Sequence, residues 1–198
     1  TVSDREFAAA RDRVMIGVKD VSRRPSDRDR RFVAFHELGH ALMRMHVGGR
    51  VEKVSIEPRG LSLGVTLTAV EDVESALKTE KEFRQEVLVL MGGRAAEQVF
   101  CEAITNGASD DMLKASELAR MALLRYGFNE HGPYVPKSEG LIKEMEEQAR
   151  EWVLKAYEEA VTIMQQHTES MKSLAMELLA KEELPGEALA ALTKADRP

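Results

Sequence analysis

Two histidines and a glutamate stand together in the segment His-Glu-Leu-Gly-His at residues 36–40. On a helix of about 3.6 residues per turn, His36 and His40 leave the same face, one above the other. They can therefore hold one Zn²⁺ with bonds of about 2.0–2.1 Å. Glu37 leaves a different face, so it can take a proton from a water on the metal and pass it to the leaving amine of a cleaved peptide. The segment predicts a metal-dependent hydrolytic site with Glu37 as its base.

A catalytic zinc site also needs a third protein ligand and an open position. Three acidic residues are candidates for this ligand: Glu97, Asp110 and Asp111. Each also has an ordinary structural interpretation, because Glu97 could lie at the surface and the two aspartates suit the first turn of a helix. Spacing alone leaves the choice among the three open. The remaining histidines are poorly placed for this role: His46, His131 and His167.

The residues around this segment predict a helix followed by a hairpin. Ser26 is expected to cap the helix and Gly48-Gly49 to end it. Val51 to Ile56 is a predicted strand, and residues 58–60 form a predicted turn. Residues 61–68 alternate apolar and polar side chains, which predicts a half-buried second strand.

Helices are expected over most of the remaining chain. Thr79 and Glu82 form a capping box that opens a helix to about residue 99. Ser109 is expected to cap another helix, which ends at Gly127. Further helices are predicted at residues 3–14, 141–167 and 169–181, with a short one after residue 185.

The predicted fold class is mainly α with a small β-hairpin or sheet. A catalytic half carries the zinc helix, and a C-terminal helical bundle follows it. We expect residues 26–136 to form the catalytic core and residues 137–198 the C-terminal helical part, with residues 1–25 leading into the core. The apolar stripes of the C-terminal helices fit packing within the chain and assembly between chains equally well.

Composition argues against several classes of protein. The 198 residues include 28 basic and 34 acidic ones, a net charge of -6, whereas nucleic-acid binders are usually basic. Cys101 is the single cysteine, so no internal disulfide is possible and a reducing compartment is the default expectation. No apolar run approaches the roughly 20 residues of a membrane-spanning helix.

Several segments resemble blocks of the proteolytic domain of the FtsH family, the membrane-bound ATP-dependent zinc proteases of peptidase family M41. They occur in the family's order over nearly the whole chain, so together they are more specific than the five-residue motif. The matching segments are residues 4–17 (the end of the ATPase module), 32–42 (the zinc helix), 54–66 (the active-site strand), 91–100, 105–115 and 154–179 (the C-terminal helices).

This resemblance implies a role for several residues outside the motif. Asp111 would be the third zinc ligand, and Glu97 would be a supporting acid beside the ligands. The strand at Gly64, Val65 and Thr66 would pair with an extended substrate, a mode of binding that accepts many sequences. From the residues alone, that strand is equally well explained as half of a core hairpin.

The resemblance also implies a zinc endopeptidase of protein quality control that hydrolyses unfolded or tagged proteins. It implies an ATPase (AAA+) module acting in cis or trans, a homo-hexamer, and a catalytic portion on the cytoplasmic or equivalent face of a membrane that anchors the parent protein. No Gly-rich phosphate loop of the Walker type occurs in these residues, so either the ATPase part lies outside them or the protein works without one. Residues 128–138 form a shorter segment than the family usually has beside its cleft.

A competing hypothesis is a catalytically silent oligomerisation or adaptor domain derived from the same family. Against it, His36, Glu37, His40 and Asp111 are all present, whereas a decayed site usually lacks at least one such residue. A purely structural zinc site fits poorly, because such sites usually have four protein ligands and favour cysteine.

Overall fold

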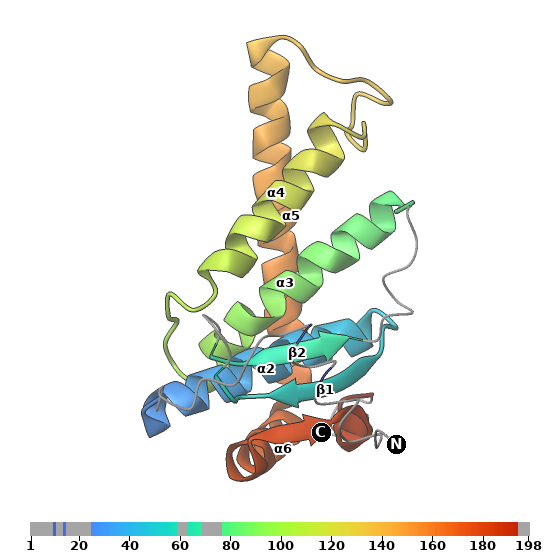
Figure 1. Ribbon diagram of the computed structural model, residues 1–198. Helices are drawn as coiled ribbons and strands as arrows, with labels where there is room; N and C mark the ends of the chain where they lie inside the picture. The colour runs from blue at the N-terminus through green and yellow to red at the C-terminus, as the bar shows by residue number, and fades with distance from the viewer. Residues whose placement is uncertain (1–9, 11–13, 15–24, 59–62, 69–76, 194–198) are drawn as a thin grey trace.

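The computed structural model describes residues 10, 14, 25–58, 63–68 and 77–193. Within these ranges the prediction of a mainly helical chain with a small sheet is confirmed (Figure 1). The predicted helix at residues 3–14 and the predicted turn at 58–60 fall almost entirely outside them. The elements are α2 (Asp27–His46), β1 (Val51–Ser55), β2 (Val65–Thr68), α3 (Glu80–Phe100), α4 (Ser109–Leu124), α5 (Glu139–Gln166), α6 (Thr168–Lys181), β3 (Glu183–Pro185) and the 3₁₀ helix η2 (Gly186–Thr193).

Helix α2 begins and ends where local sequence signals place its ends. The Ser26 hydroxyl accepts a hydrogen bond from the backbone N–H of Asp29 at 3.1 Å, and both Asp27 and Asp29 lie in the first turn. Carboxylates there are favoured by the positive end of the helix dipole. After the last turn, Gly48 has φ +88°, a left-handed conformation that favours glycine.

The starts of α3 and α4 differ in how well the sequence predicted them. The capping box of α3 is present, because Thr79 accepts from the Glu82 N–H and Glu82 accepts from the Thr79 N–H. For α4 the predicted cap is wrong: Ala108 is the N-cap, without a side-chain bond, and Ser109 is already the first helical residue. The preceding turn accounts for this shift, since the Ser109 N–H donates to the Asn106 carbonyl.

Helices α2 and α3 cross with their backbones in contact. A Cβ atom on Gly39 would lie 2.4 Å from the carbonyl oxygen of Gly92, and a Cβ atom on Gly92 would lie 2.5 Å from the carbonyl oxygen of Gly39. Real Cβ atoms essentially never approach so closely, so any side chain here would push the helices apart. The pair of glycines therefore sets the distance between the two helices that carry most of the candidate site.

The sheet is antiparallel, with the strand order β2-β1-β3. Val54 in the central strand pairs with Thr66 on one side and with Leu184 on the other. Strand β3 was not predicted. It follows directly after Glu182, which ends α6 in a left-handed conformation with φ +65° and turns the chain back along β1.

Strand β2 is shorter than the alternating pattern predicted. It begins at Val65, and Leu63 precedes it with an exposed side chain. Its four residues are all half-buried, so burial does not alternate along it. The reason is that β2 contacts α2, which covers Thr66 on the polar side of the strand.

One hydrophobic cluster joins all the helices in the described part of the chain. Figure 1 shows α4 beside the upper half of α5, whereas the sheet and α6 lie near the other end of α5. Helix α5 packs on α3 and α4, and α6 packs on α2. The C-terminal helices thus share a core with the elements of the catalytic half; the domain boundary at residue 136 stays a prediction.

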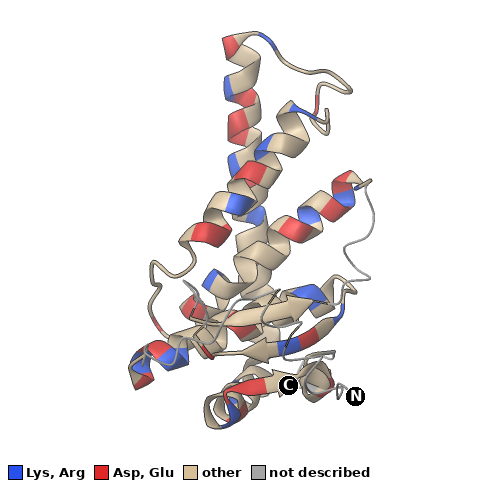
Figure 2. Cartoon of the chain, viewed as in Figure 1, with Lys and Arg blue, Asp and Glu red and all other residues tan. Residues whose placement is uncertain are grey.

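The surface carries both signs of charge. Figure 2 shows acidic and basic residues interleaved along α3, α4 and α5. Pairs one helical turn apart include Arg84 with Glu80 and Lys155 with Glu151, and such exposed pairs contribute little stability each. No described helix has the length and apolar character that a bilayer span requires.

The close contact between Gly39 and Gly92 predicts that adding one methyl group at Gly39 lowers the stability of the fold. Gly39→Ala should lower the free energy of unfolding by about 1–3 kcal/mol, because the new Cβ atom meets a carbonyl oxygen that cannot rotate away. Urea unfolding followed by circular dichroism measures this loss.

Gly140→Ala is the matched control for this substitution. Gly140 lies in the first turn of α5, where nothing is within 4 Å of the position that a Cβ atom would occupy. Alanine there should change stability by less than about 1 kcal/mol. Equal stability of the two variants would show that the crossing of α2 and α3 does not depend on Gly39.

Candidate metal centre

The residues of the motif line a cleft of about 970 Å³. Helices α2 and α3, strand β2 and the start of α4 all contribute to its wall. The fold therefore brings together segments that are far apart in the sequence, such as those of His36 and Asp111. The predicted site residues that line this cleft are His36, Glu37, His40, Gly64, Val65, Thr66, Glu97, Asp110 and Asp111.

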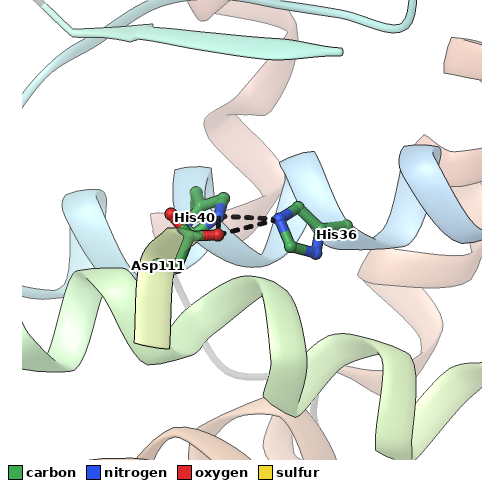
Figure 3. Close-up of side chains that lie close together, drawn as sticks. All are labelled: His36, His40 and Asp111. Carbon is green, nitrogen blue, oxygen red and sulfur yellow. Dashed lines mark hydrogen bonds and ion pairs between the residues drawn. The ribbon is translucent and has the colours of Figure 1, made fainter. Parts of the chain in front are cut away.

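Three of these side chains converge on one point. Figure 3 shows the imidazoles of His36 and His40, both from α2, meeting the carboxylate of Asp111 at the start of α4. The two Nε2 atoms are 3.0 Å apart, and Oδ2 of Asp111 lies 3.2 Å from Nε2 of His36 and 3.3 Å from Nε2 of His40. The three atoms thus form a nearly equilateral triangle.

This triangle fits a zinc ion. The ligand atoms of a tetrahedral ion with bonds of about 2.0–2.1 Å lie roughly 3.3 Å from one another. The two nitrogens and one oxygen are donors that zinc accepts. Side-chain exposures of 13% for His36, 14% for His40 and 18% for Asp111 leave the centre open to the cleft. Three protein donors and an open side are the pattern of a catalytic rather than a structural zinc site.

The outer nitrogens of both imidazoles hold the rings in the orientation that a metal needs. Nδ1 of His40 lies 2.9 Å from the carbonyl oxygen of Val89, which can only accept, so Nδ1 carries the proton. Nδ1 of His36 lies 2.9 Å from the carboxylate of Glu97 and donates to it. In neutral rings, each Nε2 lone pair then faces the centre of the triangle.

Without a metal, this arrangement must keep a proton at its centre. Burial by itself would lower the pKa of His36, but its hydrogen bonds to Asp111 and Glu97 and the nearby Glu37 charge raise that pKa to about 10. Burial would raise the pKa of Asp111, yet the two imidazoles beside it hold the pKa well below its usual range. At neutral pH the metal-free centre is therefore an imidazolium beside a carboxylate.

Glu97 supports His36 from behind and lies outside the triangle. It is 1% exposed and accepts two hydrogen bonds, from Nδ1 of His36 and, at 2.7 Å, from the backbone N–H of Thr105. Burial would raise the pKa of Glu97, but these bonds outweigh it and lower that pKa. Asp110 is exposed and also lies outside the cluster. Of the three acids that spacing left open, the structure brings Asp111 to the two histidines.

Glu37 lines the same cleft as the two histidines and Asp111, and its side chain contacts β2. It is 8% exposed, and its Oε2 accepts a 2.8 Å hydrogen bond from the Thr66 hydroxyl. Burial raises the pKa of Glu37, while His40, His36 and Thr66 partly offset that effect. The Glu37 carboxylate is thus a stronger base than an exposed glutamate. It lies beside the three side chains that converge, so it could act on a water molecule bound there.

Sequence reasoning missed the groups that hold the imidazoles. The Val89 carbonyl and the Thr105 N–H are backbone atoms, which no residue pattern reveals. Gly93 makes room for His36, because a Cβ atom there would lie 2.5–2.7 Å from three atoms of its ring. The sequence did carry a signal for this close packing. Gly92 and Gly93 are adjacent inside a helix, where glycine costs stability and so indicates that another group packs closely against the backbone.

The remaining histidines lie outside the cluster. His46 is exposed at the end of α2, and His131 pairs with Glu144 at 3.1 Å. His167 is buried at the junction of α5 and α6, where it bonds to the Ile163 carbonyl. The described cleft wall contains no residue of the short segment 128–138.

The model of peptidase family M41 matches residues 23–192. Among similar proteins, the ATP-dependent zinc metalloprotease FtsH 4 of Synechocystis is 33% identical over 96% of this chain and 34% of its own length. The ATP-dependent zinc metalloprotease FtsH 1 of Sphaerobacter thermophilus is 33% identical over 100% of this chain and 33% of its own length. The chain thus spans about a third of the length of these relatives. With its motifs, its fold and this match in agreement, the chain belongs to peptidase family M41 and corresponds to the proteolytic domain of the FtsH proteins.

Proposed function

We propose that this chain is a zinc-dependent endopeptidase in which His36, His40 and Asp111 hold the metal and Glu37 is the general base. The observation that carries the proposal is the triangle of Nε2, Nε2 and Oδ2 atoms with edges of 3.0, 3.2 and 3.3 Å. Membership of a peptidase family and the names of the relatives, which are zinc metalloproteases, support it.

The residues around the triangle have distinct tasks. Zn²⁺ bound there supplies a Lewis acid that polarises the scissile carbonyl and lowers the pKa of a water molecule. Glu37 takes up a proton at its carboxylate and passes it to the leaving amine. Glu97 and the Val89 carbonyl hold His36 and His40 in the ring orientation and tautomer that leave Nε2 free.

Strand β2 provides a surface for an extended substrate. Within the described sheet it is an edge strand, paired only with β1. Gly64, Val65 and Thr66 line the same cleft as the metal centre. We propose that the substrate backbone adds to this edge beside Gly64, Val65 and Thr66, which places little demand on substrate sequence and suits the degradation of unfolded chains.

The relatives extend well beyond the region that this chain matches. The relatives are named ATP-dependent and are about three times as long. We therefore propose that an ATPase (AAA+) module, in cis or in trans, delivers unfolded or tagged proteins to this cleft. The resemblance of the motifs supports two further proposals, a homo-hexameric assembly and a catalytic portion at the cytoplasmic or equivalent face of the membrane that anchors the parent protein.

Removing the base should separate catalysis from metal binding. Glu37→Gln should keep about one zinc per chain and lower casein hydrolysis by about 10²–10⁴-fold, because the amide cannot accept the proton. Metal analysis and hydrolysis are measured on the same samples. Zinc bound by the wild type without hydrolysis, also in the full-length protein with ATP, would favour the silent adaptor domain instead.

The ligand assignment predicts an order of zinc affinities. Asp111→Asn should weaken binding by more than about a hundredfold, and Glu97→Gln by about 10–100-fold, because Glu97 only orients a ligand. Asp110→Asn, the exposed neighbour, is the matched control and should leave affinity unchanged. Competition with a zinc-chelating dye measures all three. A larger loss for Glu97→Gln than for Asp111→Asn would reverse the two assignments.

Zinc uptake should release a proton. In the metal-free protein His36 has a pKa of about 10 and is charged at neutral pH, so the metal must displace that proton. Calorimetric titration in buffers of different ionisation enthalpy should show release of about one proton per zinc. Apparent affinity should accordingly rise about tenfold per pH unit around neutrality. Binding heats that are independent of the buffer would contradict this charge state.

A further inference from the structure

The hydroxyl of Thr66 joins strand β2 to the proposed base. Its Oγ1 lies 2.8 Å from Oε2 of Glu37 and 2.8 Å from the backbone carbonyl oxygen of the same residue. A hydroxyl has one proton to donate, so the two acceptors share it. Both acceptors belong to Glu37, which ties the hydroxyl to this one residue of α2.

Thr66 is well suited to restrict the conformations of the Glu37 side chain. It is β-branched and half-buried in a strand that pairs with β1, so its χ1 angle has few alternatives. Glu37, by contrast, has a long side chain that would occupy several rotamers in an open cleft. A fixed hydroxyl at hydrogen-bond distance removes most of that freedom.

Gly64 confines the carboxylate from another direction. A Cβ atom on Gly64 would lie 2.8 Å from Oε1 and 2.8 Å from Cγ of Glu37, so the backbone of residue 64 packs directly against this side chain. The Thr66 hydroxyl engages the other carboxylate oxygen, Oε2. The two residues of this segment therefore restrain Glu37 together, and the oxygen that Thr66 does not hold is assigned to proton transfer.

We propose that Thr66 is a positioning residue, which orients the Glu37 carboxylate through Oε2 so that Oε1 exchanges the proton during peptide hydrolysis. The inference rests on the proposed function, since it assigns the orientation of its base. The proton taken from water resides on Oε1 and then moves to the leaving amine. Oε2 remains an acceptor throughout, so the Thr66 hydrogen bond persists over the whole cycle.

This role links substrate binding to the base within one strand. The same residues, 64–66, provide the proposed edge for the substrate backbone and confine Glu37 with a side chain and a close backbone contact. A peptide that pairs with β2 is thereby placed in a fixed register relative to the base. Loss of the hydroxyl should consequently impair the chemical step and leave substrate binding intact.

Kinetics of the Thr66 variants test the positioning role. Thr66→Val keeps the shape and removes the hydroxyl, so kcat for a fluorogenic peptide should fall about 10–100-fold with little change in KM. Thr66→Ser keeps the hydroxyl and should retain most of kcat; Thr66→Ala replaces the valine variant if that variant does not fold. A rise in KM alone, or an equal loss in Thr66→Ser, would overturn the proposal.

A second measurement is independent of metal and activity. In metal-free protein labelled with ¹³C at the glutamate carboxyls, Glu37→Gln identifies the Glu37 resonance by its disappearance. This resonance should shift in Thr66→Val and keep its wild-type position in Thr66→Ser, because only the former loses the hydrogen bond. An unshifted resonance in the valine variant would overturn the positioning role. An inactive wild type that shows the expected shift would instead refute the proposed function and leave the hydrogen-bond role supported.

Discussion

The contact between α2 and α3 is the constraint on which the rest of the site depends. At Gly39 and Gly92 the two helices touch through backbone atoms. Directly after this contact on α3, the absence of a side chain at Gly93 admits the His36 ring. The short distance between the helices also brings Glu97 and the Val89 carbonyl to the outer nitrogens of the two imidazoles. A wider crossing would leave the rings without these partners and free to rotate.

The proposed metal centre brings together three electron-pair donors, which need a proton or a metal ion between them. Two ring nitrogens and a carboxylate oxygen within 3.3 Å of one another are mutually repulsive unless a proton or a metal ion lies at their centre. Without a metal, a proton on His36 takes this central place, which is why the pKa of His36 is raised. Around the triangle, hydrogen bonds from outside fix the tautomers, so the geometry is prepared before a metal arrives.

Strand β2 illustrates where pattern and structure diverge. Its alternation of apolar and polar residues predicts a half-buried strand with an apolar and a polar face. In the structure the polar side of β2 meets α2, so Thr66 bonds to Glu37 and the whole strand is half-buried. The pattern encodes only the separation of two faces; which neighbour covers each face depends on packing between elements that are distant in sequence.

The sequence by itself determined the features that depend on a few neighbouring residues. The ends of α2, the capping box of α3 and the common helix face of His36 and His40 follow from local hydrogen bonding and helical period. Spacing left Asp111, Glu97 and Asp110 open, and the family resemblance implied Asp111; the tertiary structure brought Asp111 to the two histidines, formed β3, and supplied the Val89 and Thr105 backbone groups. These depend on contacts across roughly 8 to 130 residues of chain, and such contacts are set by how helices and strands pack rather than by the spacing of residues.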